Sequence, residues 1–370
     1  YPTIRPHRMA IGFYNLVGDA LVRTHRLELD VEGARTEVAE LVGLERPALI
    51  LLNDDDLTYA KVRLDEESWK FALANLDKLT DPLARAQVWG SAWDATRDGE
   101  ASASDFISLV LGNVENEDQG TMLITLLRQL VTTAKIYTRA DSRDQHWAHI
   151  AKTLLDLAGK AKPGSDNQLL FVRFATYFAK DSQSADVLQA IFDGSKVLNG
   201  LALDQDMRWD LINGLVMSGR LGVEAIEAEA AKDNTANGAK QAIMARTSIP
   251  TASGKKAGWD LVLNDPDLSN TDINFGCQGL VRAHDVSLLE PMVDWYFEAA
   301  MNVWNTRTFK IAEYILRGAF PFYLANEALA NRTRAFAHSA EVAAKPALQR
   351  IMLENLDSVD RALKAQKADH

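Results

Sequence analysis

Hydrophobic and polar residues alternate with a period close to two from residue 4 to residue 64. Met9, Ile11 and Phe13 alternate with polar or small neighbours, a pattern typical of a strand with one buried face. Turn-forming residues, such as Glu32-Gly33, separate the alternating segments from one another. Four or five short strands in hairpins predict a small β-sandwich. So few strands hardly suffice for a closed core, and one further strand could lie upstream of Tyr1. The predicted strands are 9–13, 21–30, 48–52 and 59–64.

At Asp65 the period changes to 3.6. Asp65 is a candidate helix N-cap, and Glu66 and Glu67 suit the positive end of the helix dipole. Apolar residues then recur on one face, and similar segments follow to the C-terminus with no strand-like alternation. We predict a domain of strands over residues 1–64 and a helical domain over 65–370. After the first helix, the predicted helices are 84–96, 104–111, 120–137, 143–158, 169–178, 184–192, 206–218, 223–233, 239–248, 251–263, 287–301, 307–320, 326–337 and 346–366.

A short sequence echo suggests a repeat. Trp-Asp-Leu-Ile at 209–212 is followed fifty residues later by Trp-Asp-Leu-Val at 259–262. Stacked helix pairs of that period form a solenoid with a concave face, so we predict an α-solenoid. The alternative is that the tryptophans simply fill contacts between helices.

Composition and charge narrow the class of protein. The 370 residues are 47% hydrophobic and 25% charged, which is typical of a globular chain, and no apolar run is long enough for a membrane span. The net charge of −11 disfavours general nucleic-acid binding. A single cysteine, Cys277, excludes an intrachain disulfide and fits a reducing, cytoplasmic compartment. The start at Tyr1, without an initiator Met or signal-peptide pattern, favours a piece of a longer protein.

Sequence motifs for catalysis are scarce. H-E-x-x-H, the P-loop, G-x-G-x-x-G and G-x-S-x-G are all absent. Ser253–Lys256 matches S-x-x-K without its companion motifs. His146 and His149 could hold a metal with a third ligand, but a solvated helix start fits them better. Asn53–Asp56 is better explained as a turn than as a cation site, and Cys277 as a buried thiol. We predict no catalytic residue and no metal ligand.

Four basic residues stand out near the later helices. Arg307, Lys310 and Arg317 fall on one face of a predicted helix, and Arg282 precedes them. In an acidic protein such a stripe could attract a carboxylate or a phosphate. The alternative is an exposed face balanced by Glu298 and Glu313. The sequence alone therefore shows no active site.

Eight segments stand out along the chain, and those at 51–65 and 89–100 are the most specific. The segments are Tyr1–Arg8, Ile11–Tyr14, Glu40–Val42, Leu51–Asp65, Trp89–Glu100, Asn305–Thr308, Leu348–Arg350 and Arg361–Gln366. They resemble a known family, the actinobacterial aminopeptidase N group of M1 zinc metallopeptidases. The resemblance covers essentially the whole chain, and its helical part is similar to the C-terminal domain of the endoplasmic-reticulum aminopeptidases.

The resemblance implies a β-sandwich linker followed by a HEAT-like, bowl-shaped helical domain that covers the zinc site and encloses a peptide cavity. It also implies that the zinc ligands, the general-base Glu and the substrate-binding G-x-M-E-N motif lie in a catalytic domain upstream, so zinc belongs to that domain and this chain is inactive alone. Its partners would be the catalytic domain and peptide substrates, with no nucleic acid and no membrane. Arg282, Arg307, Lys310 and Arg317 would then be candidates to bind the carboxylate at the far end of a peptide.

A second hypothesis is an independent helical-repeat scaffold that binds a protein partner on its concave face. It predicts a stable fold without an upstream domain. An enzyme with an unrecognised site at His146 and His149 is a third, weaker alternative.

Overall fold

The computed structural model describes residues 4–370, so the first three residues of the resembling segment Tyr1–Arg8 lie outside the described residues. The chain divides into two compact units. The first runs to Thr133 and also includes Ala368–His370, and the second is Ala134–Lys367. Residues 4–370 form three strands and seventeen α-helices, so the prediction of a mainly α fold is confirmed. The boundary between a domain of strands and a helical domain at residues 64 and 65 stays a prediction.

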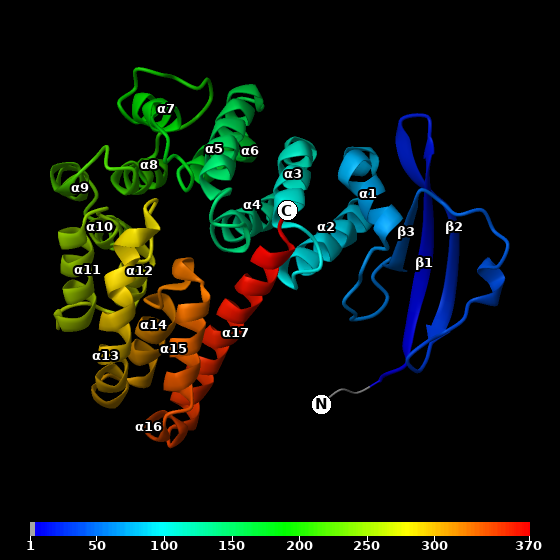
Figure 1. Cartoon of the computed structure of the whole chain (residues 1–370). Coiled ribbons are helices and arrows are strands. Elements are labelled where there is room, and N and C mark those ends of the chain that lie inside the picture. Colours follow the sequence, from blue (N-terminus) through cyan, green and yellow to red (C-terminus); the bar gives the residue numbers. More distant parts are fainter. Residues whose placement is uncertain (1–3) are drawn as a thin grey trace. The chain divides into compact units, whose positions relative to one another are not determined.

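The first unit begins with one antiparallel sheet, drawn in blue in Figure 1. Its strands are β1 (His7–Val17), β2 (Ala20–Val31) and β3 (Leu49–Asp54), in the order β2-β1-β3. A tight turn with Gly18 at φ 63° joins β1 to β2. Ala10, Tyr14, Leu49 and Leu51 are almost wholly buried, which gives this small sheet an apolar core.

The expected fourth strand at 59–64 does not form, and that prediction was wrong. This segment has no regular secondary structure and pairs with no strand, and Tyr59 is fully exposed. Ion pairs hold the segment instead, because Lys61 and Arg63 both reach Asp98, at 2.5 Å each. Residues 4–370 therefore contain one three-stranded sheet and no second sheet of a sandwich.

The turn after β3 is a hydrogen-bonded turn, as the Asx interpretation predicted. Asn53 Nδ2 donates to the Thr58 carbonyl (2.8 Å), and Asn53 Oδ1 accepts from the Thr58 amide (3.0 Å). Asp54 is buried and accepts from Tyr14 Oη (2.8 Å) and Arg23 (2.8 Å). Asp55 accepts from Arg23 at 2.7 Å as well. Asp54 and Asp55 thus pair with the Arg23 cation, and Asp54 accepts a further hydrogen bond from Tyr14, all within the same unit.

Four helices complete the first unit. Asp65 and Asp81 cap the first two, since each carboxylate accepts from two backbone amides of the first turn. The chain's end contributes a similar contact, because Asp369 Oδ1 accepts from the Ser104 amide (2.8 Å) at the start of α3. The helices are α1 (Glu66–Asn75), α2 (Pro82–Arg97), α3 (Ala103–Asn113) and α4 (Gly120–Thr132).

The second unit is helical throughout, from green to red in Figure 1. One helix, α12, was not predicted, although it packs against α10 and α14. A short α16 was also missed. The helices are α5 (Arg143–Lys160), α6 (Asp166–Ala175), α7 (Ser182–Phe192), α8 (Gln205–Met217), α9 (Val223–Ala230), α10 (Ala236–Thr247), α11 (Ala252–Asn264), α12 (Asn270–Leu280), α13 (Glu290–Thr306), α14 (Phe309–Gly318), α15 (Glu327–Ala337), α16 (Ala340–Ala343) and α17 (Pro346–Ala368).

The two echoed tryptophans lie in different surroundings. Trp209 is fully buried and its Nε1 donates to Asp233 (2.8 Å), whereas Trp259 packs against Trp295 with ring centroids 6.1 Å apart. Both rings fill contacts between helices, as the alternative explanation expected. A HEAT-like solenoid therefore stays a prediction.

Candidate functional site: a buried group of cations and aromatic rings

The most unusual side chain of the second unit is Lys135. It lies on a π-helical turn, Thr133–Tyr137, and is only 2% exposed. Its ammonium nitrogen lies 5.6 Å from the ring centroids of Trp147 and Tyr177 and 5.4 Å from that of Tyr323. Within residues 4–370 it has no hydrogen-bond partner. Aromatic faces stabilise a cation but do not replace the hydrogen bonds it had in water.

Arg282 contacts the same group of rings. Its guanidinium carbon lies 4.8 Å from the Tyr177 ring centroid, and its Nη2 is 3.0 Å from Tyr177 Oη. The Arg282 carbonyl accepts from the buried Lys255 Nζ (2.6 Å), which also donates to the Thr247 carbonyl (3.1 Å). We call Lys135, Lys255 and Arg282, with the rings of Trp147, Tyr177 and Tyr323, the Lys135 cluster.

The electrostatics of the cluster follow from burial and like charge. Burial lowers the pKa of Lys135 to about 7, and the nearby Arg282 charge contributes in the same direction. The same two causes, in the same order, lower the pKa of Lys255 to about 7. His284, whose ring packs 5.7 Å from Trp147, has a pKa lowered to about 3, chiefly by burial and then by Lys135. His284 is therefore neutral at physiological pH.

Two carboxylates around the cluster have other partners. Asp210 forms an ion pair with Arg173 (2.6 Å), and burial raises the pKa of its carboxyl, while the charges of Arg173 and, more weakly, Arg282 act to lower it. Asp144 accepts from Lys180 at 2.6 Å. Lys255 satisfies its ammonium with backbone carbonyls, so Lys135 is left as a buried amine without a counter-ion among the described residues. The cluster can therefore accept negative charge.

The structure separates the four cations predicted from sequence. Arg282 is half-buried in the Lys135 cluster. Arg307 donates to the Leu263 carbonyl and lines a polar cavity of about 320 Å³ with Asn264 and Asn302. Lys310 is exposed, forms an ion pair with Glu313 (2.9 Å) and lies over the ring of Tyr314.

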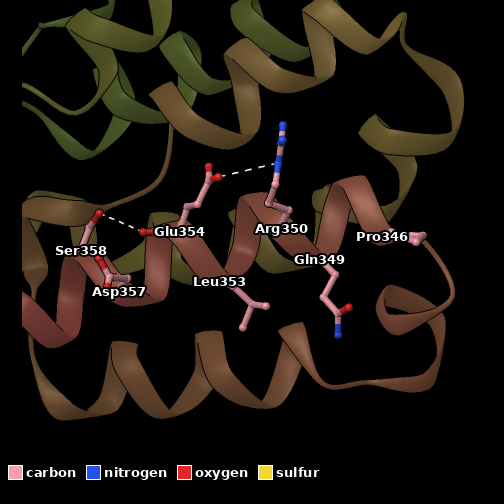
Figure 2. Close-up of a pocket in the computed structure, with 7 residues that line it drawn as sticks. All are labelled: Pro346, Gln349, Arg350, Leu353, Glu354, Asp357 and Ser358. Atoms are coloured by element: carbon pink, nitrogen blue, oxygen red, sulfur yellow. Dashed lines mark hydrogen bonds and ion pairs between the residues drawn. The ribbon is translucent and has the colours of Figure 1, made fainter. Parts of the chain in front are cut away.

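Arg317 pairs with Glu313 (3.4 Å) and, at 2.5 Å, with Glu354 on α17. Glu354 also lines the depression shown in Figure 2, where it faces Arg350 at 3.6 Å. That depression has a volume of about 560 Å³ and is formed by one face of α17. Arg317 therefore has two carboxylate partners of its own, unlike Arg282.

The weaker sequence candidates have structural explanations. Ser253 lies at the start of α11, where its hydroxyl contacts Thr251 at 3.2 Å. Cys277 is fully buried, which raises its thiol pKa to about 12. Among residues 4–370 no group of three or more His, Cys, Asp or Glu could hold a metal ion.

Sequence reasoning missed most of the Lys135 cluster. Lys135 and Lys255 lie on different helical segments, 120 positions apart. The one available signal was Lys135 itself, the single charge in the segment from Leu130 to Tyr137. A lysine on the apolar face of a helix is a candidate for burial, but its partners depend on the tertiary structure.

Comparison with known proteins identifies the class. The sequence profile of the ERAP1-like C-terminal domain matches residues 49–361, so the chain belongs to that family. The chain is 39% identical over 369 residues to an aminopeptidase N of Streptomyces lividans, covering all of this chain and 43% of that protein. The chain thus spans less than half the length of this relative. Together the matches support the C-terminal part of a peptidase. No helix within residues 4–370 has the length and apolar character to cross a membrane.

Proposed function

We propose that this chain is the non-catalytic C-terminal portion of a zinc-dependent aminopeptidase, which releases N-terminal residues from peptides. The observation that carries the proposal is the whole-chain identity to an aminopeptidase N of more than twice this length. The missing H-E-x-x-H motif fits a zinc site elsewhere in the longer polypeptide. The helical part would cover the active site, form the peptide cavity and limit access to it. The proposed setting is cytoplasmic, as the single cysteine suggests.

One experiment tests whether catalysis belongs to the rest of the polypeptide and not to this chain. The purified chain is assayed for hydrolysis of alanine and leucine anilides, its zinc content is measured, and the separately expressed catalytic half is then added. We expect no turnover and no stoichiometric zinc from the chain alone, and re-association with the catalytic half. Chelator-sensitive turnover by the chain alone would contradict the proposal. Failure to associate would favour the scaffold hypothesis instead.

We further propose that Arg282 receives the carboxylate at the far end of a bound peptide. Arg307, Lys310 and Arg317 were candidates on the same grounds, and they stay candidates. Arg282 is favoured because no carboxylate forms an ion pair with it among residues 4–370 and because it is half-buried, where a charge-assisted hydrogen bond is stronger than in water.

The test compares free and amidated peptides in the intact enzyme. Arg282→Met should lower kcat/KM by about tenfold for peptides with a free C-terminal carboxylate, as expected for a lost charged hydrogen bond. The same substitution should leave amidated peptides nearly unchanged, because they carry no carboxylate. Arg246→Met is the matched control, since Arg246 pairs with Glu227 on an exposed helix contact. Equal losses for both peptide types would rule out Arg282 as a carboxylate ligand.

A further inference from the structure

The counter-ion of Lys135 is missing from the described chain. Its amine is 2% exposed, it donates no hydrogen bond, and Arg282 adds like charge nearby. An isolated charge in such a site is expensive, because no carboxylate among the described residues forms an ion pair with it. Tyr177, Tyr323 and Arg282, which border the amine, are only half-buried, so the cluster extends from the interior to partly exposed side chains.

A second buried group adjoins the same rings. His284 is 7% exposed, and neither of its ring nitrogens forms a hydrogen bond of good geometry within residues 4–370, although the nearby Tyr177 backbone acts to raise its pKa. Its ring packs against Trp147, which also borders Lys135. Neutral imidazole carries one N–H donor, so Lys135 and His284 can both donate hydrogen bonds, and Lys135 has no acceptor among the described residues. These two buried side chains around one tryptophan fit a ligand that accepts hydrogen bonds.

From this arrangement we propose that the Lys135 cluster binds a small inorganic monovalent anion, such as chloride or bromide, held by Lys135 Nζ with His284 beside it. The charge fits because one ammonium lacks one counter-charge. The aromatic lining favours a weakly hydrated anion, since sulfate or phosphate loses far more hydration on entering and needs more donors than the site offers. This site is separate in role from the proposed peptide carboxylate at Arg282.

The test uses the intact polypeptide without peptide substrate, at about pH 6.5, where Lys135 is largely charged. Crystals grown without halide are soaked in bromide, and anomalous density is examined at Lys135. In parallel, Tm is followed against halide concentration at constant ionic strength, with gluconate as the replacement. At an anion concentration tenfold above Kd, Tm should rise by about 1 to 2 °C.

Lys135→Met should abolish both signals while keeping the apolar stem of the side chain. Lys180→Met is the matched control, because Lys180 also lies over the Trp147 ring (5.9 Å) but is paired with Asp144. It should keep the bromide density and the rise in Tm. No bromide density at Lys135 in the unmodified protein would overturn the proposal, and that arm does not depend on how the variant folds. Stabilisation by acetate but not by bromide would overturn it too, because a carboxylate site would then be indicated.

Discussion

The guanidinium of Arg282 lies 4.8 Å from the centre of the Tyr177 ring, and Lys135 lies 5.6 Å from the same ring centre. One aromatic side chain therefore borders two cations that come from segments far apart in the sequence. Cations that share an aromatic neighbour still repel each other, and in a buried site that repulsion is weakly screened. The protonation of Lys135 thus depends on Arg282.

Arg282→Met should raise the pKa of Lys135 above its value of about 7, because a neighbouring positive charge is removed. The pKa can be followed through the pH dependence of the lysine ¹³Cε chemical shifts, assigned with Lys135→Met. Arg307→Met, which removes a cation at another cavity, should leave it unchanged. An unaltered titration in the Arg282 variant would show that burial alone lowers the pKa.

Lys135→Met should stabilise the protein more at neutral pH than at high pH. The folded pKa of Lys135, about 7, lies below its unfolded value near 10.5, so the unfolded state binds more protons between these pH values. Stability of the unmodified protein therefore rises with pH across this window. The cost of burying the amine is largest below pH 7, where it approaches roughly 5 kcal/mol, and fades toward pH 10.

The measurement is urea unfolding across this pH range in halide-free buffer. Lys256→Met is the control, since Lys256 is exposed and pairs with Asp260 (2.5 Å). The difference between the Lys135 variant and the unmodified protein should shrink as pH rises. A constant difference would mean that Lys135 titrates normally.

Gly279→Ala should destabilise the second unit by about 3 kcal/mol or more. A Cβ at Gly279 would lie 2.1 Å from both the Met244 carbonyl oxygen and Thr247 Oγ1, and the carbonyl belongs to backbone that cannot move aside easily. Gly159→Ala is the matched control, because a Cβ at this position on α5 would have no other atom within 4 Å. That change should stabilise by roughly 0.5 to 1 kcal/mol. Thermal unfolding of both variants checks the contrast, and a harmless Gly279→Ala would contradict the packing of α12 on α10.

Glu229→Gln should destabilise the contact between α8 and α9 by roughly 3 kcal/mol at neutral pH. The Glu229 side chain is 2% exposed and accepts from Arg208 Nε (2.7 Å) and Nη2 (2.8 Å). The hydrogen bond with Arg208 is the main cause that lowers the pKa of Glu229 to about 2. Its stabilisation is present above the unfolded pKa near 4.5 and is lost as pH falls toward 2.

The variant and the unmodified protein should therefore converge in stability in strong acid. Glu227→Gln serves as the control, since Glu227 is a neighbouring exposed acid paired with Arg246 (2.7 Å). It should cost less than about 1 kcal/mol. Equal costs for the two substitutions would mean that the buried position of Glu229 contributes nothing.

The sequence by itself determined where most elements lie and which family the chain belongs to. Periodicity near two predicted the paired strands around residues 9–13 and 21–30, and a period of 3.6 predicted most helices, because these patterns record which face of an element is buried. Asp65 was correctly predicted as a cap, since its contacts are to the next few amides. The family resemblance rested on local segments and was confirmed over the whole chain.

Tertiary structure alone decided the rest. The helix α12 carries Asn270, Gly276 and Gly279, residues of low helix propensity, and forms because its glycines allow close approach to α10 and α11. The segment 59–64 alternates like a strand but found no neighbouring strand to pair with. In the Lys135 cluster, Lys135 lies 120 positions before Lys255 and 147 before Arg282. The burial of these cations, their mutual repulsion and the rings that they share all depend on which segments pack together. The spacing of residues along the sequence does not give that information.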